Sequence, residues 1–104
     1  MTYSWKKQEE VERFFEENEL GGTTPFRLLD LVSEIGEIAK DATKTAQYGE
    51  KPEKLQVKED ELGDALFSLL AVANDLEIDI EEALEKSLEK YRERIDEKGD
   101  PGSK

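Results

Sequence analysis

Two pairs of acidic residues with helical spacing are the part of this sequence best suited to chemistry. Glu34 and Glu37 form the first pair, and Glu61 and Asp64 form the second. Residues three apart lie on one face of an α-helix, so each pair presents two carboxylates in one direction. Carboxylate oxygens are the ligands that Mg²⁺ prefers, and a carboxylate can also accept the proton of an attacking water. Two such helices side by side predict a Mg²⁺ site, in which Mn²⁺ could substitute.

Asp64 lies within a segment that is apolar on nearly every side, from Leu62 to Ala73. Such a segment is typical of a helix that is buried on several sides. An unpaired charge is costly there, so Asp64 must be neutralised, hydrogen bonded or placed beside a cation. An alternative stays open, because in so acidic a chain such pairs also arise by chance and then face solvent.

The composition of the 104-residue chain limits the remaining chemistry. It contains no His and no Cys, which excludes Ser-His-Asp and Cys-His nucleophiles and disfavours a typical zinc site. Its formal net charge of -12 repels nucleic acids and anionic membrane surfaces, so neither is an expected partner. Because no signal peptide or membrane-spanning segment is evident, the expected location is the cytoplasm.

Hydrophobic periodicity and helix-end signals predict four helices and no strand. The expected fold is all-α, a four-helix bundle-type domain over residues 1–96 that oligomerisation completes, followed by a disordered tail over residues 97–104. The predicted helices run from an N-cap at Ser4 to about Leu20, from an N-cap at Thr24 to about Tyr48, from about Glu53 to Leu76, and from an N-cap at Asp79 to about Ile95.

The segments 28–39 and 61–67 resemble the EExxE and ExxD motifs of MazG-like nucleotide pyrophosphohydrolases. The similarity extends over about residues 25–95. It implies an all-α enzyme, usually dimeric or tetrameric, that uses Mg²⁺ to cut a nucleoside triphosphate between its α and β phosphates. Glu34 and Glu37 match the second and third acids of the first motif, whereas Glu61 and Asp64 match the second motif. The resemblance therefore implies that these four residues are catalytic and bind the metal.

Two positions depart from the family pattern. Ser33 replaces the first Glu of the first motif, which leaves the number of metal ions and the identity of the base open. On the last helix Leu88 replaces an Asn, but Lys90 and Arg94 match a basic pair that faces the phosphates in the family. The resemblance thus implies that Lys90 and Arg94 bind substrate, and the alternative is a solvated basic stripe balanced by nearby Glu residues.

The expected function is a Mg²⁺-dependent hydrolase that converts a (d)NTP to a (d)NMP and pyrophosphate. By analogy with the family it would remove unwanted nucleotides, as a homodimer or homotetramer. One alternative is a non-catalytic acidic helical module that binds a basic protein partner. A carboxylate-bridged di-iron bundle ranks last, because that site needs His ligands and the chain has none.

Overall fold

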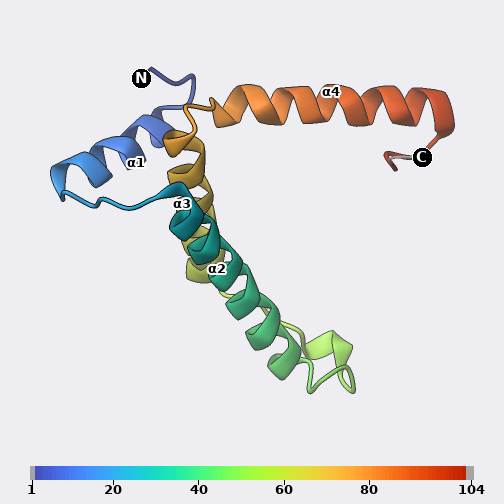
Figure 1. The fold of residues 1–104 in the computed structure, drawn as a ribbon. Coiled ribbons are helices and arrows are strands. Elements are labelled where there is room, and N and C mark those ends of the chain that lie inside the picture. Colours follow the sequence, from blue (N-terminus) through green and yellow to red (C-terminus); the bar gives the residue numbers. More distant parts are fainter. Residues whose placement is uncertain (1, 103–104) are drawn as a thin grey trace.

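The computed structural model describes residues 2–102, and this range folds into four α-helices (Figure 1). No strand occurs within the range, so the all-α fold class predicted from the sequence is confirmed. The helices are α1 (Lys6–Glu17), α2 (Thr24–Thr45), α3 (Glu59–Asp75) and α4 (Ile80–Lys98), and a short 3₁₀ helix, η1 (Pro52–Lys54), lies between α2 and α3.

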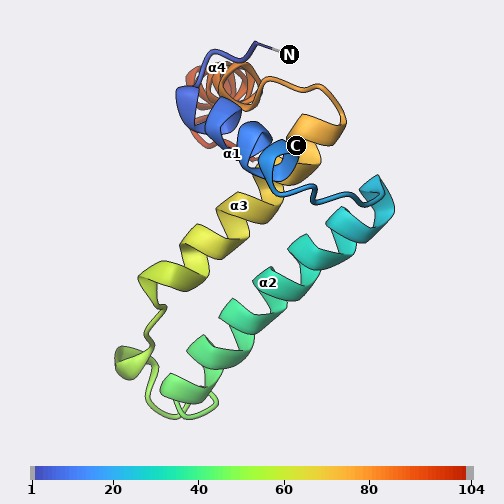
Figure 2. The same cartoon turned by 90° about the vertical axis from the view of Figure 1, so that its left-hand side faces the viewer.

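α2 and α3 form an antiparallel helical hairpin, and this pair has the most extensive contact between helices in the described chain (Figure 2). α1 packs against the C-terminal half of α3. The most buried stretch of α3 is Leu70–Ala73, and Ala42 and Ala46 are the buried residues near the end of α2. The small residues on α2 allow the two helix backbones to approach closely, which fixes the two acidic pairs on rigid elements.

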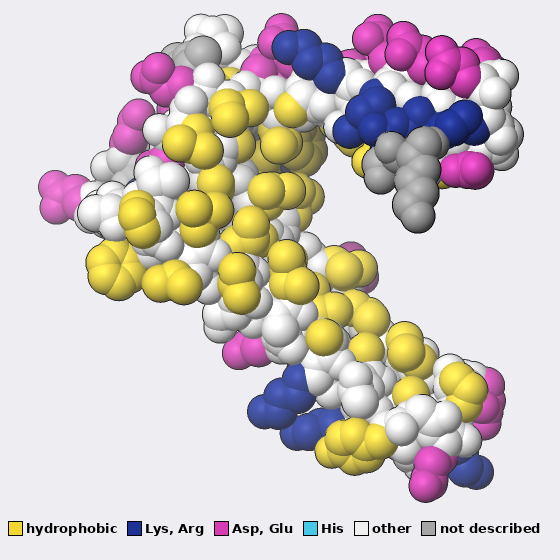
Figure 3. All heavy atoms as spheres, turned by 45° about the vertical axis from the view of Figure 1, so that its right-hand side comes forward, with side chains coloured by type: hydrophobic (Ala, Val, Ile, Leu, Met, Phe, Trp, Pro, Cys, Tyr) yellow, Lys and Arg dark blue, Asp and Glu magenta, His cyan; other side chains and the backbone are white. Residues whose placement is uncertain are grey.

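α4 leaves the end of the hairpin where α1 lies and extends away from it (Figure 1). Only its first turns approach α1 and α3, around Trp5, Leu66 and Leu84. Hydrophobic side chains therefore cover much of one face of the molecule (Figure 3). Within residues 2–102 no helix is long and apolar enough to cross a membrane.

The expectation that the whole segment from Leu62 to Ala73 is buried is wrong for its first half. Leu62 is 56% exposed and Leu66 is 43% exposed, and Asp64 also lies on the surface. The reason is that α1 covers mainly the second half of this segment and reaches the first half chiefly through the contacts of Phe14 and Phe15 with Phe67. Asp64 therefore avoids the desolvation cost of a buried carboxylate within a single chain.

The start of α3 also differs from the prediction. α3 begins at Glu59, not near Glu53, because Pro52 opens the 3₁₀ helix and the next residues adopt an extended conformation. The Gln56 N–H donates a hydrogen bond to Thr45 Oγ1 at 2.8 Å, which attaches this extended segment to the end of α2. The polar first half that the sequence assigned to the third helix is thus mostly loop.

Asp79 is the N-cap of α4, as predicted, and its Oδ1 accepts a hydrogen bond from the Glu82 N–H at 3.1 Å. The prediction that Ser4 caps α1 is wrong, since Trp5 occupies that position without a side-chain hydrogen bond. Ser4 instead donates from its N–H and its hydroxyl to Asp79 Oδ2, at 2.8 and 2.7 Å. These bonds, the hydroxyl bond foremost, lower the pKa of the Asp79 carboxyl and join the N-terminal segment to the start of α4.

A buried polar network fixes the corner between α3 and α4. Gln8 is fully buried, and its Nε2 donates to Asn74 Oδ1 at 2.9 Å and to the Ile78 carbonyl at 2.8 Å. Its Oε1 accepts a hydrogen bond from the Ile80 N–H at 2.9 Å. One side chain of α1 therefore satisfies polar groups on both sides of the turn and sets the direction in which α4 leaves.

Replacing Gln8 by Leu should destabilise the protein by about 2–3 kcal/mol, because buried partners lose their hydrogen bonds while the volume hardly changes. The free energy of unfolding, measured by urea denaturation, checks this expectation. Gln56→Leu, at an exposed loop position, is the matched control and should change stability by less than about 0.5 kcal/mol. Equal stability of the two variants would show that the Gln8 bonds do not hold the corner.

The raised pKa of the Tyr3 phenol predicts that the protein loses stability at high pH. Burial, followed by the negative charge of Glu12, raises its pKa to about 12. Unfolding exposes the phenol, which then ionises near its ordinary value of about 10. The contribution of the neutral Tyr3 phenol to the free energy of unfolding is therefore complete below about pH 10 and is lost as the pH rises toward 12. Urea midpoints between pH 9 and pH 11 should fall more steeply for the wild type than for Tyr3→Phe, and parallel curves would contradict this assignment.

Candidate functional site

A cavity of about 240 Å³ lies between α2 and α3 and contains two of the predicted acids. We call it the acidic cavity. Glu34 enters it from α2 and Asp64 from α3, so the structure brings together one member of each acidic pair. Ser33, the residue that replaces a motif Glu, also reaches the cavity and contributes a neutral hydroxyl. The complete lining is Asp30, Ser33, Glu34, Asp64, Phe67 and Ser68.

Glu34 is the half-buried acid of the first pair. Burial raises the pKa of its carboxyl, and the negative charges of Glu37, Asp64 and Asp30 raise it further. Each of these effects makes the ionised form of Glu34 less favourable. A divalent cation beside Glu34 would relieve the repulsion from Glu37 and Asp64 at once.

Glu61 lies in the first turn of α3, one turn before Asp64. Its Oε1 accepts a hydrogen bond from the Lys58 N–H at 3.3 Å. A hydrogen bond with the Asp41 side chain, followed by partial burial, raises the pKa of Glu61. Asp41 is on α2, so this hydrogen bond joins the two helices. Asp41 therefore lies beside the predicted acids, although the predicted site does not include it. The signal for it is its spacing, one turn after Glu37 on the same helical face.

The structure does not bring all of the predicted site residues together. Within residues 2–102 no group of three acidic side chains is already positioned to hold a metal ion. Glu37 influences Glu34 electrostatically but, like Glu61, is absent from the cavity lining. The site of a single chain is therefore an open row of carboxylates along two helices.

Lys90 and Arg94 are on α4, which extends away from the α2–α3 hairpin (Figure 1). The Lys90 ammonium lies 4.9 Å from the centre of the Tyr91 ring, and the Arg94 guanidinium lies 5.8 Å from it. Arg94 Nη1 also donates a hydrogen bond to the Pro101 carbonyl at 3.2 Å. Neither cation lines the acidic cavity of its own chain.

The donor atoms around the acidic cavity fit a hard divalent cation. They are carboxylate and hydroxyl oxygens, with no nitrogen or sulfur donor among the cavity's side chains. Burial raises the pKa of Glu34 most, and the charges of Glu37, Asp64 and Asp30 add to it, so a cation beside this carboxyl would be favourable. On this chemistry Glu34 and Asp64 would hold the ion, with Glu37 and Glu61 adjacent.

Comparisons with known proteins agree with this architecture. Residues 26–98 match the MazG nucleotide pyrophosphohydrolase domain. The uncharacterized protein YpjD of Bacillus subtilis (strain 168) is 37% identical over 79 residues, which are 71% of this chain and 69% of that protein. A crystal structure of Bacillus subtilis YpjD, described as a candidate pyrophosphatase, superposes with a TM-score of 0.69 and 34% sequence identity and covers 88% of this chain and 94% of its own. The chain therefore belongs to the MazG nucleotide pyrophosphohydrolase family.

Proposed function

We propose that this protein is a Mg²⁺-dependent nucleoside triphosphate pyrophosphohydrolase that releases a nucleoside monophosphate and pyrophosphate. The observation that carries the proposal is the meeting of Glu34 and Asp64 in one cavity between two rigid helices. Family membership supports hydrolysis of a pyrophosphate bond in a nucleotide. The biological role would be removal of unwanted nucleotides from the cellular pool, a role that rests on the family analogy.

In the proposed reaction water attacks the α phosphorus and pyrophosphate leaves. Bound Mg²⁺ supplies charge neutralisation, polarises the phosphoryl oxygens and makes the water more acidic, and Mn²⁺ could replace it. Glu34 and Asp64, which share the acidic cavity, would hold this ion together with Glu37 and Glu61, and the four acids would thereby orient the triphosphate relative to the water. A carboxylate of this set that the ion leaves uncoordinated would accept the proton of the water.

Phosphate recognition requires cations, and a single chain keeps the two predicted ones, Lys90 and Arg94, out of its own acidic cavity. Lys90 and Arg94 offer a point charge and a planar fork for phosphate oxygens, but α4 carries them away from its own hairpin. Large apolar side chains on α2 and α3 are exposed, among them Leu62 at 56%, Phe26 at 67% and Val32 at 65%. Association with a second copy would remove this apolar surface from water. We therefore propose a homodimer or homotetramer in which α4 of one copy approaches the acids of another.

Product analysis with a panel of ribo- and deoxyribonucleoside triphosphates tests the function. With Mg²⁺ we expect monophosphate and pyrophosphate in equal amounts and no diphosphate or orthophosphate. EDTA should abolish both products, and added Mg²⁺ or Mn²⁺ should restore them. A panel without cleavage, in which Mg²⁺ also fails to raise the melting temperature, would instead favour an acidic module that binds a basic protein.

A further inference from the structure

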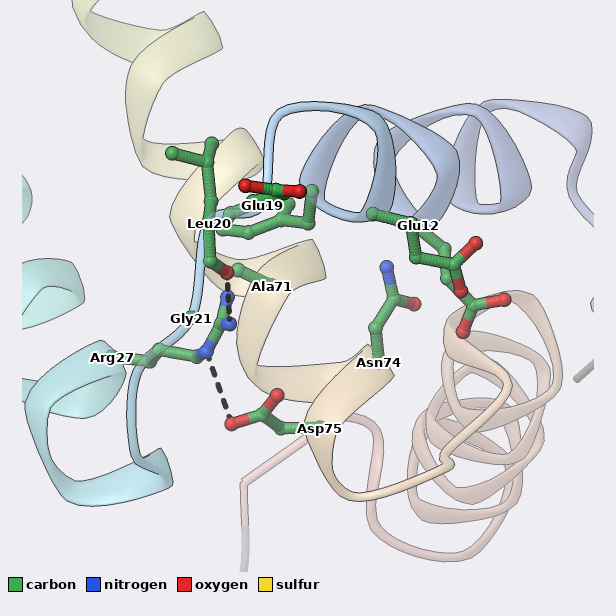
Figure 4. Close-up of a pocket in the computed structure, with 10 residues that line it drawn as sticks. Glu12, Glu19, Leu20, Gly21, Arg27, Ala71, Asn74 and Asp75 are labelled. Atoms are coloured by element: carbon green, nitrogen blue, oxygen red, sulfur yellow. Dashed lines mark hydrogen bonds and ion pairs between the residues drawn. The ribbon is translucent and has the colours of Figure 1, made fainter.

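A second cavity, of about 450 Å³, lies where α1 meets the α2–α3 hairpin (Figure 4). We call it the α1 cavity. Arg27 lies on one side of it and Glu12 on the other, and the Asn74 amide projects between them from the end of α3 (Figure 4). Its lining includes Glu12, Glu16, Arg27, Ala71, Asn74 and Asp75.

The α1 cavity continues along the same helix faces as the acidic cavity. On α3, Asp64 and Ser68 line the acidic cavity, and Ala71 and Asp75 line the α1 cavity. These positions recur at three- and four-residue steps, so they share one face of the helix. Two turns of α-helix, about 11 Å, separate Asp64 from Ala71. This spacing is comparable to the reach of a nucleotide from its phosphate to its base.

Two aromatic rings form a wall between the cavities. Phe67 lines the acidic cavity and Phe15 lines the α1 cavity. Their rings stack with a centroid distance of 5.3 Å and an interplanar angle of 22°. These apolar rings separate the polar linings of the two cavities, and a ligand that occupied both would run past the rings along α2 and α3.

Arg27 is a fixed cation in the α1 cavity. Its guanidinium lies 4.4 Å above the Phe15 ring, and its Nη2 donates to the Leu20 carbonyl at 3.2 Å. Its Nε is 3.1 Å from Asp75 Oδ2, but the geometry leaves this buried N–H without a hydrogen-bond partner. Asp75 also accepts from the Thr24 hydroxyl at 3.1 Å, so the arginine is held from several directions.

The remaining polar groups of the α1 cavity are mainly acceptors. Glu12 and Glu16 contribute carboxylates from α1, and Asp75 contributes one from α3. Gln8 holds the Asn74 amide in place through a 2.9 Å hydrogen bond. The surplus negative charge disfavours a phosphate here, whereas acceptor oxygens suit a ligand edge that carries N–H donors.

We infer that the α1 cavity binds the base of the nucleotide and prefers bases that carry an exocyclic amino group. This inference rests on the proposed function, which places the phosphates at the acidic cavity. Adenine, guanine and cytosine can donate from their amino groups to Glu16 or Asp75. Uracil and thymine present two carbonyl oxygens and lack such a group. These two bases therefore offer fewer N–H donors to the carboxylates of the α1 cavity.

Steady-state kinetics of the full chain with ATP, GTP, CTP, UTP and dTTP tests the preference. The amino-bearing substrates should have kcat/KM about tenfold higher, chiefly through a lower KM. Asp75→Asn and Glu16→Gln should each reduce the ratio of kcat/KM between amino-bearing and other substrates. The reason is that an amide side chain also offers donors to the carbonyl oxygens of uracil and thymine. Glu17→Gln, the adjacent exposed residue outside the cavity lining, is the control and should retain it. Equal ratios in the wild type and all variants would overturn the inference.

Nucleosides without phosphate separate this inference from the proposed function. In NMR titrations adenosine should shift the side-chain N–H signals of Arg27 and Asn74 more than uridine does. If no triphosphate is cleaved while this difference holds, the base site stands and the proposed reaction is wrong. If triphosphates are cleaved while neither nucleoside shifts these signals, the reaction stands and the base site is wrong. If uridine shifts them as strongly as adenosine, the amino preference is wrong.

Discussion

Asp64→Asn is expected to reduce kcat/KM for the preferred triphosphate by about a thousandfold. The substitution keeps the size of the side chain and removes one negative charge from the acidic cavity, where Asp64 meets Glu34. Because Asp64 is exposed and caps no helix, folding should be unaffected and the circular dichroism spectrum should match the wild type. The measurement is pyrophosphate release at several Mg²⁺ concentrations.

The dependence on Mg²⁺ distinguishes loss of a ligand from loss of structure. If Asp64 holds the ion, higher Mg²⁺ should recover part of the activity of Asp64→Asn, since weaker binding is offset by mass action. Asp96→Asn, an equal charge change at an exposed position on α4, is the control and should retain nearly full activity. An Asp64→Asn variant as active as this control would remove Asp64 from the proposed metal site.

The sequence predicts the fold best where local signals act alone. Asp79 is a helix N-cap because its short side chain reaches the N–H of Glu82, a purely local interaction. Ser4 carries the same local signal, but Asp79 offers it two hydrogen bonds from a distant part of the chain. The third helix begins at Glu59 and not near Glu53 for a similar reason. The hydrogen bond between Gln56 and Thr45 is a tertiary contact, which the spacing of apolar residues does not indicate.

The prediction for the site depends on the same distinction between local spacing and tertiary packing. Spacing identified Glu34 and Asp64, and the antiparallel hairpin places them in one cavity. It could not show that Glu61 contacts Asp41, because that contact depends on the register between α2 and α3. The apolar segment around Asp64 suggested burial within one chain. The structure instead leaves this half of α3 open, as expected for a surface that a second copy could cover.

A double variant, Lys90→Ala with Arg94→Ala, should lower kcat/KM by about a hundredfold, chiefly through a higher KM for the triphosphate. The physical reason is the loss of two cations that would contact phosphate oxygens. Neither side chain lines the acidic cavity of its own chain, and α4 extends away from that cavity. The loss should therefore act between copies of the chain.

Mixing this double variant with Asp64→Asn distinguishes contributions within a chain from contributions between chains. In a symmetric dimer with shared sites, one site of each mixed dimer combines the intact acids of one copy with the intact α4 of the other. Random mixing should then restore about a quarter of wild-type activity, because half of the dimers are mixed and half of their sites are intact. If each chain used its own α4, every site in the mixture would carry a defect. The mixture would then be no more active than its separate components, and the proposed shared site would be wrong.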